Sequence, residues 1–230
     1  MPLPKVVRWS FGLVIAALLT VVPFVYYRAV YTYGKRLREV TPGRFYRSGQ
    51  MTVAGFIDAV RRYGIKTVVN LQDEYPDPDV WRGYFDRRTV KESELCRRLG
   101  VRYVFLRPDL IPRRQVPAHR PAAIDRFLAL LDQESAYPVL IHCKAGLHRT
   151  GVMTAVYRME YQKWSRADAH RDLKANGFGE FVSTAANDYI MQYILTYRPG
   201  LRNTEGRRQK AEAGSQKSKA ADFCFLPSAF

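Results

Sequence analysis

A cysteine and an arginine lie at a spacing that suits phosphate chemistry. Cys143 closes the apolar run Val139–Cys143 (VLIHC), and Arg149 follows six residues later. Cleaving a phosphate ester needs a nucleophile that is ionised near neutral pH. A free cysteine has a pKa of about 8.5, which a helix N-terminus and nearby cations lower. The planar guanidinium of Arg149 can bind two phosphoryl oxygens at once, as a lysine cannot. The pattern therefore predicts phosphoryl transfer through Cys143.

The residues around this pair suit a phosphate-binding loop. A short loop containing Gly146 can turn its backbone N–H groups inward as an anion nest. Thr150 can hydrogen-bond the cysteine sulfur and assist its departure in a second step. His142 orients the loop, because a thiolate needs no general base. The predicted substrate-binding residues are Lys144, Ala145, Gly146, Leu147, His148 and Arg149.

Two of these loop residues are basic. Lys144 and His148 either supply extra positive charge for a second phosphate or an acidic lipid headgroup, or are solvated side chains that only raise the local potential. The whole chain has a net charge of +16. Residues 1–43 carry six basic and one acidic side chain, and residues 201–230 carry six and three, which leaves about +8 on residues 44–200.

At these residues the sequence resembles the cysteine-dependent protein tyrosine phosphatase superfamily, whose loop reads His-Cys, five residues, Arg, then Ser or Thr. Over residues 44–197 it looks like the bacterial dual-specificity-type members, and the form HCKxGxHRTG is similar to atypical plant and fungal dual-specificity phosphatases. The segments that carry the resemblance are RFYRSGQ (44–50), IKTVVNLQDE (65–74), PVLIHCKAGLHRTG (138–151) and WSRADA (164–169).

The resemblance implies a general acid on a loop before the cysteine. Asp109, in the sequence RPDLIP, lies 34 residues before Cys143 and could protonate the leaving oxygen. Asp73 or Glu74 is the alternative acid. The resemblance also implies a phosphorylated protein, a phosphoinositide or an inositol phosphate as substrate. No cofactor is expected, and because no Cys/His cluster has zinc spacing, no metal is predicted.

The elements that must position these residues alternate between helix and strand. Short apolar runs predict buried strands, and amphipathic segments between them predict helices. This order predicts an α/β domain with a central, mostly parallel sheet flanked by helices, and with the Cys-x5-Arg loop between a central strand and a helix. The expected strands are 44–48 (at the sheet edge), 67–71, 101–106 and 139–143. The expected helices are 52–63, 89–99, 121–133, 151–164, 165–177 and 183–197.

The N-terminal region predicts a membrane anchor. Trp9 to Tyr27 has no charged side chain, and as a helix it would be roughly 28 Å long, close to the thickness of a bilayer's hydrocarbon core. More basic residues follow this stretch than precede it, which favours a catalytic domain facing the cytoplasm. The predicted division is a flank (1–8), a transmembrane helix (9–27), a juxtamembrane linker (28–43), a phosphatase domain (44–200) and a disordered basic tail (201–230).

Other functions fit the residues less well. A non-catalytic phospho-binding module needs neither Cys143 nor Arg149. Sulfur transfer does not explain the spacing of this pair, and arsenate reduction needs resolving thiols. Cys96 reads as a core residue and Cys224 lies in the tail. The tail lacks the interleaved aromatic residues of a specific nucleic-acid site. The sequence specifies neither the substrate nor an oligomeric state.

Overall fold

A computed structural model of the chain describes residues 4–83, 85–108, 120–179 and 190–201. The chain divides into two units, residues 1–197 and 198–230. Only residues 198–201 of the second unit are described, so the predicted disordered tail remains a prediction. Part of the predicted last helix (183–197) also lies outside the described residues, and its described end contains η4 (Met191–Leu195).

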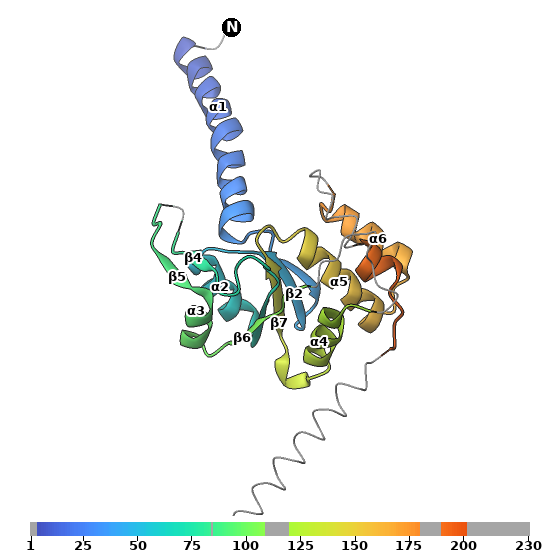
Figure 1. The fold of residues 1–230 in the computed structure, drawn as a ribbon. Coiled ribbons are helices and arrows are strands. Elements are labelled where there is room, and N and C mark those ends of the chain that lie inside the picture. The colour runs from blue at the N-terminus through green and yellow to red at the C-terminus, as the bar shows by residue number, and fades with distance from the viewer. Residues whose placement is uncertain (1–3, 84, 109–119, 180–189, 202–230) are drawn as a thin grey trace, which may run out of the picture. The chain divides into compact units, whose positions relative to one another are not determined.

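A five-stranded sheet forms the centre of the first unit (Figure 1). The neighbouring pairs among its last four strands are parallel, and the first strand is antiparallel to the second. The sheet is therefore mostly parallel, as predicted. In spatial order its strands are β1 (Arg38–Thr41), β2 (Phe45–Gly49), β7 (Val139–Cys143), β3 (Thr67–Asn70) and β6 (Arg102–Phe105).

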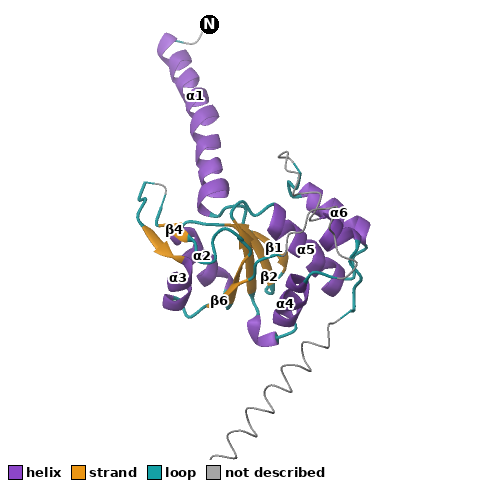
Figure 2. Cartoon of the chain, in the orientation of Figure 1, coloured by secondary structure: helices purple, strands orange, loops and turns teal. Residues whose placement is uncertain are grey.

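Helices cover both faces of this sheet (Figure 2). On one face lie α2 (Val53–Tyr63) and α3 (Glu92–Arg98). Their apolar side chains form a core cluster with strand residues such as Val68 and Leu140. The other face packs against the helices α4 (Ala122–Leu131), α5 (His148–Tyr161) and α6 (Arg166–Ala175).

The first three residues of β7 are apolar because both faces of this central strand are covered. In β7, Val139 and Ile141 belong to one core cluster and Leu140 to the other, and all three are fully buried. Successive side chains of a strand point to opposite faces, so a two-sided core requires continuous apolar residues. The three predicted apolar strands correspond to β3, β6 and β7.

Local signals located most helix ends correctly. The Thr52 side chain accepts a hydrogen bond from the Gly55 N–H and caps α2, which ends at Gly64 in the left-handed conformation. Ser165 caps α6 in the same manner. The helix expected from residue 89 begins later. Thr89 begins a short strand, so α3 starts only at Glu92.

Two other predictions need correction. The strand that begins after Arg44 was expected at the sheet edge, but β1 pairs with it and makes it an interior strand. The predicted linker (28–43) therefore contains an edge strand. Residues 73–88, where neither a strand nor a helix was expected, contain β4 (Asp79–Trp81), which pairs with β5 (Thr89–Lys91).

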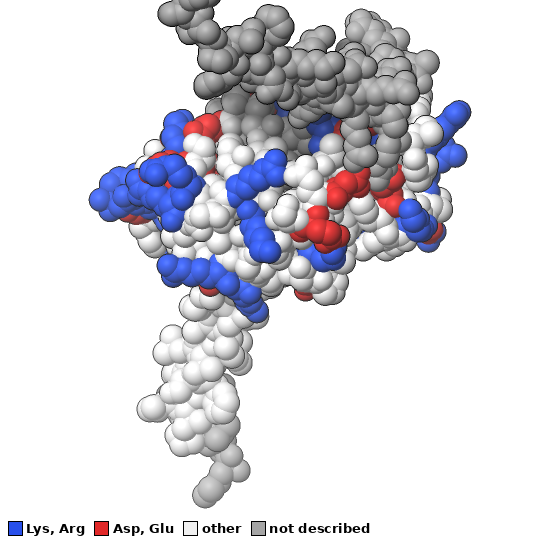
Figure 3. Space-filling view, turned by 90° about the horizontal axis from the view of Figure 1, so that it is seen from below, with Lys and Arg blue, Asp and Glu red and all other residues white. Residues whose placement is uncertain are grey.

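The N-terminal residues form a long helix, α1 (Lys5–Arg28), which continues as η1 (Ala29–Tyr33). Trp9–Tyr33 is long and apolar enough to cross a membrane. In Figure 3 the rod formed by this helix is white for most of its length, whereas Lys and Arg are spread over the surface of the rest of the chain. A further short helix, η3 (Glu134–Ala136), precedes β7.

Candidate active site

The predicted phosphate loop lies at the carboxyl end of the central strand. β7 ends at Cys143 and α5 begins at His148, so four residues form the connection. Cys143 is 4 % exposed and pairs in register with Gly49, the last residue of β2. The first turn of α5 contains Arg149 and Thr150. The structure thus brings the predicted nucleophile, loop and arginine together at one helix N-terminus.

The carbonyl groups of this loop are bound by donors from outside the loop. Three consecutive carbonyls accept such bonds: Lys144 from the Gln50 N–H at 3.2 Å, Ala145 from Arg36 Nη1 at 3.0 Å, and Gly146 from Arg47 Nη2 at 2.8 Å. In a planar trans peptide the N–H points away from the carbonyl. Carbonyls directed outward therefore turn the next N–H groups inward, as an anion nest requires.

Two glycines permit the close approach of the loop and β2. Gly146 has a φ of +74°, and a Cβ there would lie 2.5 Å from the Gly49 nitrogen and 2.6 Å from the Ser48 carbonyl carbon. A Cβ at Gly49 would lie 2.9 Å from the Ala145 carbonyl carbon. Neither position has space for a side chain, and the positive φ at Gly146 is strained for any other residue.

Arg47 is a buried cation beneath the loop. It is 4 % exposed, and burial lowers its pKa to about 10. Nearby charges also act on it, with Asp172 and Cys143 favouring its charged form. The segment RFYRSGQ contains this residue, but sequence analysis assigned it no role. A tertiary contact with Gly146, 99 residues away, shows what it binds.

Arg149 is held by two carboxylates from the loop after β3. Its Nη1 and Nη2 each donate to a Glu74 carboxylate oxygen at 2.9 Å, and Nη2 also forms an ion pair with Asp73. The hydrogen bonds from Arg149 lower the Glu74 pKa to about 2. Burial raises the pKa of Asp73, and the neighbouring Glu74 raises it further. Of the two carboxyls next to Arg149, that of Asp73 thus keeps its proton more readily than usual.

The position of Asp109, the preferred general acid from sequence, lies outside the described residues. Asp73 and Glu74, the alternative acids, contact Arg149 directly. A general acid must hold a proton before it can donate one. Of these two alternatives, Asp73 with its raised pKa fits that requirement better than Glu74.

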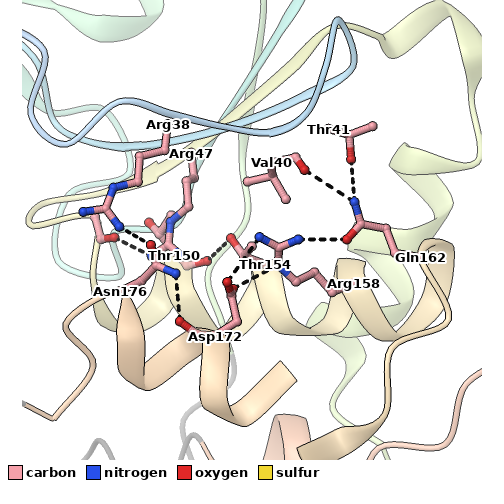
Figure 4. A network of polar contacts seen from close by, with 11 residues as sticks. Arg38, Val40, Thr41, Arg47, Thr150, Thr154, Arg158, Gln162, Asp172 and Asn176 are labelled. Carbon is pink, nitrogen blue, oxygen red and sulfur yellow. Dashed lines mark hydrogen bonds and ion pairs between the residues drawn. The ribbon is translucent and has the colours of Figure 1, made fainter. Parts of the chain in front are cut away.

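Thr150 is fully buried in the first turn of α5. Its backbone carbonyl accepts a bond from the Thr154 hydroxyl at 2.7 Å (Figure 4), while its own Oγ1 has no hydrogen-bond partner among the described residues. A buried hydroxyl usually has a partner. Its placement leaves it available for the predicted bond to the sulfur of Cys143.

His142 contacts a buried carboxylate. Its Nε2 lies 2.9 Å from Glu92 Oε1, and both side chains are 2 % exposed. The His142 carbonyl accepts a bond from the Leu71 N–H at 2.8 Å. His142 is thus fixed on both sides, which agrees with an orienting role. Glu92 was not predicted as its partner, because the two residues are far apart in the sequence and only the tertiary structure brings them together.

The two basic residues of the loop differ in their surroundings. Lys144 is exposed, and its Nζ lies 5.8 Å from the centre of the Tyr75 ring. His148 is half-buried against Phe178, and burial together with the Arg149 charge lowers its pKa below the ordinary value of 6.5. His148 is therefore neutral at pH 7, and of the two only Lys144 adds charge there.

The helix that carries Arg149 is tied to its neighbours by polar contacts (Figure 4). Arg158 of α5 donates to both carboxylate oxygens of Asp172 on α6, at 2.9 and 3.3 Å, and to Gln162. Gln162 in turn donates to Thr41 of β1 at 2.9 Å. These bonds fix α5 against α6 and the sheet edge.

The remaining cysteine of the described residues has a structural position. Cys96 is fully buried in the α3 core, as predicted, and burial raises its pKa far above the ordinary value. Among the described residues there is no group of three or more His, Cys, Asp or Glu side chains arranged to hold a metal ion. Cys224 lies outside the described residues.

Comparison with known proteins places this site in a family. The family model described as a DSP-PTPase phosphatase fused to NAD+ kinase matches residues 24–188. The chain belongs to this phosphatase family. The phosphatase thus falls within the cysteine-dependent protein tyrosine phosphatase superfamily, as the loop motif predicted. The match extends upstream of residue 44, where the resemblance in the sequence began.

Individual relatives agree with this placement. The phosphatase is 35 % identical over 121 residues to OCA1 of Mycosarcoma maydis, named as a tyrosine-protein phosphatase, covering 53 % of this chain and 67 % of OCA1. It is 37 % identical over 70 residues to the dual specificity protein phosphatase TpbA of Pseudomonas aeruginosa. That match covers 28 % of this chain and only about a third of TpbA (32 %).

A solved structure shares the fold. The crystal structure of P. aeruginosa TpbA superposes with a TM-score of 0.51 at 23 % sequence identity, covering 70 % of this chain and 84 % of TpbA. The mostly parallel sheet with helices on both faces is therefore the fold of this superfamily.

Proposed function

We propose that this phosphatase hydrolyses phosphate monoesters through a cysteinyl-phosphate on Cys143. The loop geometry carries the proposal. Cys143 ends the central strand, three following carbonyls are directed outward, and Arg149 lies in the first turn of α5. This arrangement supports Cys143 as the nucleophile, with N–H donors and the Arg149 guanidinium near it to bind a phosphoryl group.

The reaction proceeds in two displacements. The sulfur of Cys143 attacks phosphorus, the S–P bond forms, and the P–O ester bond breaks while a carboxylic acid protonates the leaving oxygen. Water then attacks the phosphoryl group and gives its proton to the same carboxylate. The S–P bond breaks, and inorganic phosphate leaves. Thr150 donates to the departing sulfur.

The charge that develops on phosphorus is stabilised by groups of the chain itself. The inward N–H groups are fixed before the substrate arrives, and donors preorganised in this way are the most effective. Arg149, in the first turn of α5, adds positive charge beside them. The mechanism needs no Lewis acid. Asp109 or Asp73 supplies the proton.

The substrate class and the membrane location belong to this proposal as well. We propose a phosphotyrosine or dual-specificity protein substrate, or a phosphoinositide or inositol phosphate, with α1 anchoring the enzyme and its domain facing the cytoplasm. The exposed Lys144 and the basic domain favour anionic substrates. An apolar helix of this length favours an anchor.

The decisive experiment compares wild type with Cys143→Ser for phosphate release from tyrosyl, seryl, phosphoinositide and inositol phosphates. Turnover is abolished because a hydroxyl is a far poorer nucleophile at neutral pH. Cys143→Ser still binds inorganic phosphate, since the nest and Arg149 remain. Cys96→Ser is the matched control, because that thiol is buried away from the loop.

Three results would contradict the proposal. Turnover by Cys143→Ser at the wild-type rate would show that Cys143 is not the nucleophile. Loss of activity in a chelator, restored by a divalent ion, requires a metal. The third result is a wild-type protein that binds phosphate but hydrolyses none of the four substrate classes. It would favour the alternative function, a phospho-ligand-binding module on the same fold.

A further inference from the structure

The segment that follows the N-terminal helix contacts the phosphate loop directly. Arg36 Nη1 donates to the Ala145 carbonyl at 3.0 Å across 109 positions of sequence. The Lys35 carbonyl accepts a bond from the Gly49 N–H at 2.7 Å, and Gly49 lies beside Cys143 in the sheet register. Two neighbouring residues of the predicted linker thus bind the end of β2 and the loop.

The backbone of this segment is held in an uncommon conformation. Lys35 and Arg36 have φ values of +40° and +58°, which residues other than glycine rarely adopt. The conformation is fixed by the Arg36 N–H, which donates to the Val30 carbonyl, and by the Leu37 N–H, which donates to Gly34. Such strain persists only where the surroundings impose it, and it is concentrated at functional sites.

Further contacts connect Arg36 with the end of the helix. Its guanidinium lies 4.8 Å from the centre of the Tyr31 ring, a cation–π distance. Tyr31 stacks on Tyr27 with ring centres 5.2 Å apart. Leu37, on the other side, packs against the core cluster of α2 and α3. The side chain of Arg36 is therefore held in place between the aromatic pair and the loop.

The bond to Ala145 determines the direction of one donor of the nest. The peptide that carries the Ala145 carbonyl also carries the Gly146 N–H, and the two point in opposite directions. When Arg36 holds this carbonyl outward, the Gly146 N–H is directed inward. Gly146 has a positive φ and no side chain to restrict its rotation, so an external tether is the means by which this peptide keeps one orientation.

We propose that Arg36 is a positioning residue of the phosphatase reaction, which acts by fixing the Ala145–Gly146 peptide of the phosphate loop. The proposal rests on the proposed function of this loop. It also makes the segment after the anchor a part of the catalytic support, so the enzyme's activity depends on a residue that sequence analysis placed in a linker.

The test uses the full-length enzyme in detergent micelles. Arg36→Met removes the donor and the charge but retains the length of the side chain. Hydrolysis of p-nitrophenyl phosphate gives kcat and KM, and calorimetry gives the Kd for inorganic phosphate. We expect kcat to fall about tenfold and the phosphate Kd to rise by a similar factor, less than the 10²–10³ typical of deleting an oxyanion donor outright.

Two control variants separate positioning from charge. Lys35→Met removes a neighbouring positive charge but retains the backbone carbonyl that binds Gly49, so we expect a smaller loss of kcat than in Arg36→Met. Arg61→Met removes an exposed charge on α2 and serves as the baseline for both measurements. Arg36→Lys, which retains one donor and the charge, should recover part of the lost kcat.

The outcomes that overturn the proposal are specific. Arg36→Met with the kcat and phosphate Kd of Arg61→Met shows that the contact has no role. If Arg36→Met and Lys35→Met lose kcat equally, and added salt abolishes both losses, the effect is only a long-range electrostatic attraction. If Arg36→Met is unfolded at the assay temperature, Arg36→Lys decides: a folded Arg36→Lys with a lower kcat than Lys35→Met supports positioning, and the reverse order refutes it.

Failure of the proposed function gives a different result. Phosphate binding is therefore also measured in the Cys143→Ser background, where no turnover is needed. An effect of Arg36→Met on phosphate Kd there supports the positioning of the loop even if Cys143 is not the nucleophile. Wild-type turnover by Cys143→Ser would refute the nucleophile and leave this measurement unaffected.

Discussion

Arg149 and Glu74 form a bidentate pair, with both guanidinium nitrogens 2.9 Å from the two carboxylate oxygens. The residues are 75 positions apart, and the pair connects the loop after β3 to the first turn of α5. A guanidinium is planar, so a carboxylate that binds one edge fixes the direction of the whole group. Glu74 thereby holds the Arg149 guanidinium in one orientation at the N-terminus of α5.

Glu74→Gln should lower kcat/KM about tenfold, because the amide holds the guanidinium less firmly than the carboxylate does. The Glu74 pKa of about 2 means that the carboxyl stays ionised at any pH above about 4. The substitution should therefore lower the pH–rate profile between pH 5 and 9 without changing its shape. A profile that loses one of its limbs in Glu74→Gln would instead make Glu74 the titrating catalytic group.

The general acid can be identified from how the loss of rate in a variant depends on the leaving group of the substrate. An acid matters most for a poor leaving group, and general acid catalysis typically supplies about 10²–10⁴-fold. Asp109→Asn is expected to slow the hydrolysis of tyrosyl phosphate by a factor close to that range. The hydrolysis of a nitrophenyl ester should slow much less. The substitution should also flatten the alkaline limb of the pH–rate profile.

Asp73→Asn is the competing variant for that role. Burial raises the Asp73 pKa, so this carboxyl retains its proton to a higher pH than an exposed one and loses it as the pH rises. If Asp73→Asn shows the dependence on leaving group and Asp109→Asn does not, the acid lies on the loop after β3. If neither variant shows it, both assignments are wrong.

Lys144 should contribute to substrate charge recognition and His148 should not. The lowered pKa of His148 leaves its ring neutral at pH 7.5, so His148→Gln removes no charge there. Lys144→Met should reduce activity on a multiply phosphorylated or vesicle-bound substrate more than on p-nitrophenyl phosphate, and added salt should act in the same direction. Kinetics on both substrates check this. Equal losses on both would indicate a general electrostatic effect only.

The N-terminal helix should retain the enzyme in membranes. The full-length chain is expected to require detergent for extraction, because α1 exposes an apolar surface over its length. A variant that begins at Arg28 should be soluble and still contain Arg36. Fractionation of both proteins tests this. Recovery of the intact full-length chain in the soluble fraction would contradict the anchor.

The loop motif, the apolar strands and most helix ends could be predicted because their signals are contiguous in the sequence. Cys143 and Arg149 are only six residues apart, so local geometry alone brings them to one helix N-terminus. A buried strand covered on both faces contains a continuous apolar run, as β7 does from Val139 to Ile141, and a cap such as Thr52 acts within three residues. These features depend on short-range sterics and hydrogen bonding, which the local sequence determines.

Only the tertiary structure decided what surrounds that loop. Arg36, Arg47 and Glu74 reach it from positions 109, 99 and 75 residues away from their partners. The local sequence assigned no role to Arg36 or Arg47, and it suggested Glu74 only as an alternative acid. The contacts of all three depend on which strands pair and on how closely two glycines let the backbones approach. Parallel pairing brings these distant segments to the same end of the sheet, where the loop's carbonyls and its arginine find their partners.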